Sequence, residues 1–86
     1  MKILSLATTT LLLALPATVF AAQMTFDQAA ERARQEVPGG HVESVESDLR
    51  QGKAVIEVEV DAPDGREHEL VFDPESGRLL SHHIDD

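Results

Sequence analysis

The spacing of apolar residues along the chain changes from a helical to a strand period near residue 40. Before that point, apolar residues recur at intervals of three and four: Phe26, Ala29, Ala30, Ala33 and Val37. Such spacing places apolar side chains along one stripe of an amphipathic helix. Thr25 and Gln28 form a capping box at its start, and the run Pro38-Gly39-Gly40 ends it. The pattern predicts one helix between residues 25 and 37.

After residue 40, apolar and polar residues alternate, which is the period of a half-buried strand. The alternation is weak over residues 42–49, strong over 54–61 and present over 66–73, and residues 78–84 would add a fourth strand. Short gaps with turn-forming residues separate these segments and are typical of antiparallel neighbours. We predict an α+β fold in which one N-terminal helix packs on a three- or four-stranded antiparallel β-meander.

The gap after the strand at 54–61 determines the register of the next pairing. Pro63 and Asp64 suit the centre of a type I turn, and Gly65 suits the left-handed position that follows. This loop pairs Ala62 with Arg66. It sets Ile56, Val58 and Val60 opposite Phe72, Leu70 and His68. A slip of one residue would mix valines with glutamates on one face, so burial selects this register. The predicted core face is Ile56, Val58, Val60, Leu70 and Phe72, covered by the helix.

The opposite face of the same strands is predominantly acidic. It carries Glu57, Glu59, Asp61, Glu67, Glu69 and Asp73, interrupted by Val55 and Val71. The register places Glu59 opposite Glu69 and Asp61 opposite Glu67, and like charges in cross-strand pairs are unfavourable. Three interpretations remain open: a solvated face that keeps the protein soluble, a docking surface for a basic partner, or a loose site for divalent cations.

Composition excludes several classes of function. The chain has 86 residues, no Cys and a formal net charge of −9. The absence of Cys rules out a disulfide framework, a thiolate nucleophile and Cys-based metal sites. The negative charge argues against nucleic acid or an anionic membrane surface as partner, since both require a basic patch. A core this small leaves little room for a walled pocket, so we expect no enzyme, no catalytic residue and no cofactor.

The histidines are weaker candidates for chemistry. His82 and His83 precede Asp85 and Asp86, and such a cluster could bind zinc, nickel or copper. Adjacent strand residues point to opposite faces, however, so one ion does not easily take both imidazoles. A solvated tail is the favoured interpretation of this cluster. We expect His68 to be a half-buried spacer at the rim of the core.

The first residues have the layout of a secretory signal peptide. A basic start at Lys2 precedes an apolar run over residues 3–15, and Pro16 breaks that run. A small-residue cleavage site follows, with cleavage favoured after Ala21. The alternative is an uncleaved membrane anchor. We therefore expect a cleaved signal peptide at residues 1–21, a single domain at 22–86, and a periplasmic or secreted location in a bacterium.

Several short motifs together resemble the PepSY domain family. They are an alanine-rich helix, Pro38-Gly39, Glu57-Val58-Glu59-Val60, and the stretch Val71-Phe72-Asp73-Pro74-Glu75-Ser76-Gly77-Arg78-Leu79-Leu80. The resemblance covers roughly residues 24–82 and departs from the usual pattern at 54–56, where no Tyr or Trp stands. PepSY domains occur in the propeptides of thermolysin-like metallopeptidases, where the resemblance implies a role in holding or inhibiting the protease. They also occur as small stand-alone secreted proteins and in membrane proteins, mostly without an assigned activity. The family has no catalytic residues to transfer.

These observations lead to a ranked set of functional hypotheses. The first is a small exported PepSY-like binding module that modulates or inhibits a protease or another envelope protein. The alternative is a periplasmic protein that binds or buffers divalent cations through its acidic sheet face or its C-terminal His/Asp cluster. A third is a structural or stress-related envelope protein without a specific ligand. Partners are expected to be proteins, with no nucleic acid and no membrane after signal cleavage.

Overall fold

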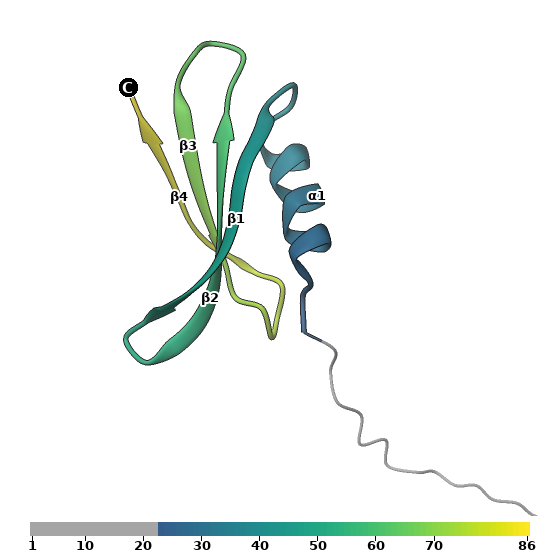
Figure 1. The fold of residues 1–86 in the computed structure, drawn as a ribbon, viewed down its shortest axis with the longest axis vertical. Coiled ribbons are helices and arrows are strands. Elements are labelled where there is room, and N and C mark those ends of the chain that lie inside the picture. Colours follow the sequence, from purple (N-terminus) through teal and green to yellow (C-terminus); the bar gives the residue numbers. More distant parts are fainter. Residues whose placement is uncertain (1–22) are drawn as a thin grey trace, which may run out of the picture.

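A computed structural model describes residues 23–86, so the predicted signal peptide lies outside the described residues. The elements are α1 (Phe26–Glu36), β1 (His41–Arg50), β2 (Lys53–Asp61), β3 (Glu67–Phe72) and β4 (Leu79–Asp85). The four strands form one antiparallel sheet in the order β1-β2-β3-β4 (Figure 1). This arrangement confirms the predicted α+β fold and adds the fourth strand to the meander.

The helix begins at the predicted capping box. The Thr25 hydroxyl accepts a hydrogen bond from the Gln28 backbone N–H at 3.1 Å, and the Thr25 N–H donates to Gln28 Oε1 at 2.8 Å. Two donors that a helix start would otherwise leave unpaired are thereby satisfied. Phe26, predicted to lie in the apolar stripe, is 48% exposed and lies outside the core cluster. The stripe packs only from Ala29 onward, one turn later.

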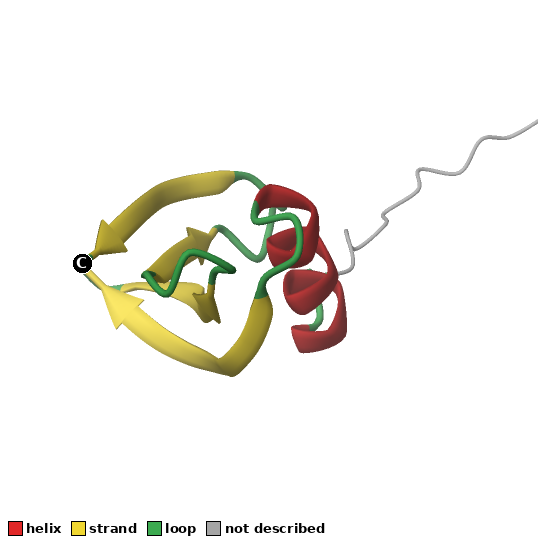
Figure 2. Cartoon of the chain, turned by 90° about the horizontal axis from the view of Figure 1, so that it is seen from above, coloured by secondary structure: helices red, strands yellow, loops and turns green. Residues whose placement is uncertain are grey.

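The core lies between α1 and one face of the sheet. Its buried members are Ala29, Ala33, Val37, Ile56, Val58, Val60, Leu70 and Phe72. The two alanines carry small side chains, which allow the helix to approach β1 and β2 closely. Figure 2 shows the helix to one side of the curved sheet. All five residues predicted for the core face of β2 and β3 are buried.

The register between β2 and β3 is the predicted one. Ile56 faces Phe72, Val58 faces Leu70 and Val60 faces His68. The Ala62 N–H donates to the Arg66 carbonyl at 2.9 Å, and Gly65 has φ +87°. The left-handed glycine therefore closes the loop as the turn chemistry requires.

The turn between β3 and β4 is held by side chains at both ends. The Asp73 carboxylate accepts hydrogen bonds from the Glu75 N–H and the Ser76 hydroxyl, each at 3.0 Å. From the helix, Arg32 Nη1 donates to the Gly77 carbonyl at 2.9 Å, and its guanidinium lies 5.3 Å from the centre of the Phe72 ring. The Asp-Pro-Glu-Ser-Gly stretch thus has a structural role, because it joins the last hairpin to the helix.

Candidate functional site

The sheet surface that points away from α1 is the candidate functional site. Antiparallel pairing places directly opposed residues on the same side of the sheet. Carboxylates from all four strands therefore share this surface, which we call the acidic face: Glu46, Asp48, Glu57, Glu59, Asp61, Glu67, Glu69 and Asp85. Five of the six residues predicted from the sequence, all except Asp73, belong to it. The carboxylates of β1 and β4 extend the predicted surface to both edges of the sheet.

Acidic residues face each other directly across the strands. Glu59 is paired with Glu69, and Asp61 with Glu67, as the predicted register requires. Glu67 also faces Asp85 on β4. The Glu59 carboxylate, followed by burial and by the carboxylates of Asp61 and Asp85, raises the pKa of Glu67 above its ordinary value. The negative field at this end of the acidic face therefore opposes ionisation of Glu67.

The other end of the acidic face is partly neutralised by Arg50. Arg50 Nη2 lies 2.6 Å from Glu57 Oε2 and 3.8 Å from Glu69 Oε1. The hydrogen bond to Glu57 raises the pKa of Arg50. The sequence pattern leaves Arg50 in the turn-forming gap between the strands predicted at 42–49 and 54–61. The contact was missed because it depends on the pairing of β1 with β2. The negative field of the face is consequently uneven.

Val55 and Val71 do not interrupt the acidic face as exposed apolar residues. They are 4% and 2% exposed. Arg50 is paired with Lys53, so its side chain must pass over Val55 to reach Glu57. The stem of a long basic side chain can cover apolar surface in this way while its charged head stays in water. The surface available to a partner is therefore polar.

Asp73 is placed differently from the other predicted site residues. It lies just beyond the end of β3, within the turn. Hydrogen bonds from the Glu75 N–H and the Ser76 hydroxyl lower the pKa of Asp73 below its ordinary value. Its acceptor oxygens are used inside the turn, and we attribute a structural role to this carboxylate.

The C-terminal histidines separate as the strand geometry predicts. His83 faces Glu69 on the acidic face and lies 2.9 Å from Asp85. His82 faces Leu70 on the other side of the sheet, where its ring contacts His68. Within residues 23–86, no group of three or more His, Cys, Asp or Glu side chains is arranged to hold a metal ion. The predicted His82–Asp86 cluster therefore does not converge on one point.

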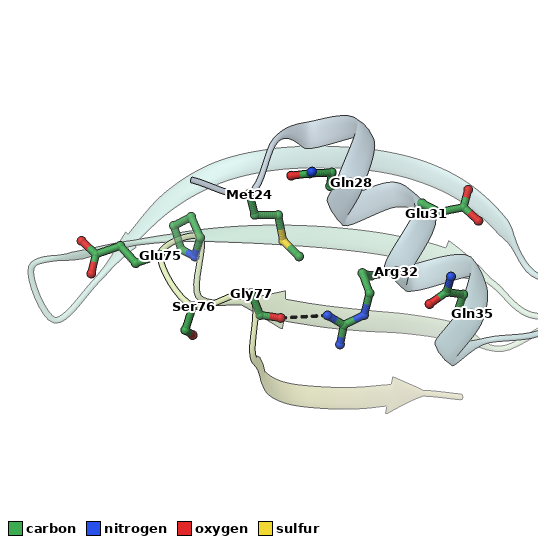
Figure 3. Close-up of a pocket in the computed structure, with 9 residues that line it drawn as sticks. Met24, Gln28, Glu31, Arg32, Gln35, Glu75, Ser76 and Gly77 are labelled. Atoms are coloured by element: carbon green, nitrogen blue, oxygen red, sulfur yellow. Dashed lines mark hydrogen bonds between the residues drawn. The ribbon is translucent and has the colours of Figure 1, made fainter. Parts of the chain in front are cut away.

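A groove of about 410 Å³ lies between α1 and the β3–β4 turn (Figure 3). Met24 and Arg32 contribute to its wall, with Ser76 and Gly77 on the facing turn. The guanidinium of Arg32 is already bonded to the Gly77 carbonyl, and it lies 3.9 Å from Glu36. Because Arg32 is used to join helix and turn, we interpret the groove as part of the fold.

Comparison with known proteins identifies the family. The model of the family described as peptidase propeptide and YPEB domain (PepSY) matches residues 23–83. The chain belongs to the PepSY family. PepSY domains are propeptide and regulatory modules, and they are typically extracytoplasmic. No curated protein and no solved structure matches the chain significantly. In the part of this PepSY protein that the structure describes, no helix has the length and apolar character needed to cross a membrane.

Proposed function

We propose that this PepSY protein is an exported binding module whose acidic face docks on a basic surface of another envelope or secreted protein. A protease is the first candidate partner, and docking would modulate or inhibit it. The observation that supports the proposal is the direct opposition of carboxylates across the strands, with Glu59 against Glu69 and Asp61 against Glu67. The family's association with peptidase propeptides supports the choice of partner.

The electrostatics explain why a basic partner would be favoured. Opposed carboxylates cost the isolated domain stability, and lysine or arginine side chains of a partner would relieve that repulsion. The raised pKa of Glu67 marks the region where relief would be greatest. A surface of one charge sign also accelerates encounter with an oppositely charged partner. The acidic face thus provides both affinity and a faster association rate.

Export is part of the same proposal. Cleavage of the signal peptide after Ala21 would leave a protein that begins at Ala22. Intact-mass measurement of protein purified from the cell envelope should give the mass of residues 22–86. A mass that includes residues 1–21, with the protein in the membrane fraction, would contradict the cleavage.

The docking surface can be tested by crosslinking in the native envelope, followed by mass spectrometry. The variant Glu59→Gln with Glu69→Gln removes two charges from the acidic face at one cross-strand pair. The matched control, Glu31→Gln with Glu36→Gln, removes two charges from exposed positions on α1. We expect crosslinks to one protein in the wild type and the helix variant, and their loss in the acidic-face variant.

A direct binding measurement completes the test. The partner recovered by crosslinking should bind more weakly as ionic strength rises, because exposed charges are screened. If it is a protease, its activity should change when the wild-type protein is added. Equal crosslinking by the acidic-face variant, or its loss only in the helix variant, would refute the docking surface. Either outcome would favour the interpretation that the acidic face only keeps the protein soluble.

A further inference from the structure

Two imidazole rings meet on the side of the sheet opposite the acidic face. His68 on β3 and His82 on β4 are diagonal neighbours, since His68 is paired with Ile84 and Leu70 with His82. His68 Nδ1 lies 2.8 Å from His82 Nε2, and the ring centroids are 5.0 Å apart with a tilt of 48°. Paired strands fix the two backbones, so this contact is set by the fold.

The facing nitrogens can both become lone-pair donors. For this contact to be a hydrogen bond, one of the two nitrogens must carry a hydrogen atom and the other must offer a lone pair. Whichever ring carries the proton at the contact can hold it on its other nitrogen instead, which is Nε2 in His68 and Nδ1 in His82. No proton has to leave the protein for this change of tautomer. Neutral imidazole with a free ring nitrogen is the commonest protein ligand for transition metals.

We propose that His68 and His82 form a two-histidine binding site for a divalent transition-metal ion, with Cu²⁺ preferred. Metal–imidazole bonds of about 2.0–2.1 Å put two cis ligands of a square-planar ion about 2.9 Å apart, and two ligands of a tetrahedral ion about 3.3 Å apart. The observed separation of 2.8 Å is that of a hydrogen bond between the two rings, so both rings would turn to aim their lone pairs at one ion. Cu²⁺ favours tetragonal geometry and is also the strongest binder in the divalent series.

The surroundings allow an ion to enter. His82 is exposed and His68 is half-buried. Water would fill the remaining coordination positions. The nearby cation Arg66 lies 3.3 Å from Asp86 and 3.8 Å from Asp64, so its charge is balanced locally. The net charge of −9 attracts cations to the molecule as a whole.

This site differs from the cation sites considered from the sequence. It uses one histidine of the C-terminal cluster and none of its carboxylates. His83 lies on the other side of the sheet, beside Asp85. The site is also separate from the acidic face, so it is independent of the proposed docking function. Either proposal can fail without the other.

The test is isothermal titration of the purified protein with CuCl₂, repeated with NiCl₂ and ZnCl₂. The chain provides matched controls, because two of its four histidines lie outside the site. We expect His68→Gln and His82→Gln to weaken Cu²⁺ binding at least about tenfold, by analogy with the 10–100-fold effect of removing even outer-shell partners. His41→Gln and His83→Gln should leave Cu²⁺ binding close to that of the wild type.

Electron paramagnetic resonance of the copper complex gives a second measurement. Coupling to two imidazole nitrogens should appear in the wild type and drop to one in the His82→Gln variant. Because His82 is exposed, that variant should fold normally, and circular dichroism checks this. Loss of binding in His83→Gln would assign the metal to the C-terminal cluster and overturn the proposal. Equal binding by all four variants would also overturn it.

Discussion

Gly40, in the loop between α1 and β1, has no room for a side chain. A Cβ atom at this position would lie 2.5 Å from Val60 Cγ1 and 2.9 Å from Val37 Cγ1. Both neighbours are buried, so neither can move freely into solvent. We expect Gly40→Ala to destabilise the domain by about 1–3 kcal/mol, the usual cost of overpacking a core. Urea unfolding measures the difference.

A double variant separates overpacking from a backbone effect. Val60→Ala removes the methyl group that the new Cβ would strike. In the combination of Gly40→Ala with Val60→Ala, the two losses should sum to more than the measured loss, as expected for residues in contact. Strict additivity would show that Gly40 matters for some other reason.

Glu67 is the residue at which repulsion within the acidic face is concentrated. Its pKa is raised in the folded state, so the folded protein holds a proton more tightly than the unfolded chain does. Stability from this group is complete below about pH 4.3 and is lost as pH rises through the folded pKa. We therefore expect Glu67→Gln to raise the melting temperature at pH 7 and to have little effect near pH 3.5.

The comparison of the two pH values is the control for this prediction. If the glutamine at position 67 acted through packing, the change in melting temperature would be the same at pH 7 and at pH 3.5. Asp73 supplies the opposite case, since its pKa is lowered in the fold, and Asp73→Asn should destabilise at pH 7 and do so less in acid. A Glu67→Gln variant less stable than wild type at pH 7 would contradict the repulsion.

Single side-chain contacts were the least predictable feature from sequence. Arg50 belongs to a turn in the sequence pattern, yet its guanidinium reaches Glu57 and Glu69. His68 was expected to be a spacer, and it contacts His82. Both contacts cross strand pairings that the sequence left unassigned. Periodicity shows which residues of one strand share a face. It does not show which side chains meet across two strands whose register is unassigned.

At the scale of elements, the β2–β3 hairpin is defined by its loop. Gly65 has φ +87°, and a Cβ there would meet no atom within 4 Å. The cost of a larger residue would therefore be conformational and not steric. We expect Gly65→Val to destabilise the domain by about 1–2 kcal/mol, because a β-branched residue is strained in the left-handed region. Thermal melting checks this.

Gly65→Asn is the matched control for the hairpin. Asparagine tolerates the left-handed region far better than valine does, so this variant should lose much less stability. Equal losses in the two variants would indicate that the preference of each residue for the left-handed region does not determine stability at this position.

The elements themselves were largely predictable, for reasons that differ between them. The capping box and the run Pro38-Gly39-Gly40 define both ends of α1, and the turn at 62–65 fixes the β2–β3 register. The β3–β4 register was not predicted. Its pairing shifts between Val71 and Phe72, and most of β4 is exposed, so no clear alternation marks its faces. A register is readable where one side of a strand is buried.

At the scale of the whole molecule, the two sides of the sheet differ in composition and in role. One side buries the core residues Ile56, Val58, Val60, Leu70 and Phe72 under α1, and the other collects carboxylates from all four strands. The main apolar core therefore lies on the helix-covered side, and the charge available to a partner lies on the opposite side. Changes on the acidic face should alter binding without unfolding the domain.

This separation predicts how salt acts on the isolated protein. Opposed carboxylates repel one another, and the screening length falls to about 3 Å at 1 M ionic strength. Salt also weakens the contacts of Arg50 with Glu57 and Glu69, but repulsive pairs outnumber these contacts on the acidic face. We expect the melting temperature to rise between low and high sodium chloride.

Calcium at constant ionic strength distinguishes a general field from a cation site on the acidic face. A bound ion would stabilise only the folded state and would add to the effect of sodium. Since no cluster of three or more candidate ligands is found within residues 23–86, we expect millimolar calcium to add little. A calcium-specific gain abolished by Glu59→Gln with Glu69→Gln would instead assign a cation site to this face. If neither salt changes the melting temperature, the carboxylates are too far apart to repel. That result would contradict the cross-strand pairing of Glu59 with Glu69.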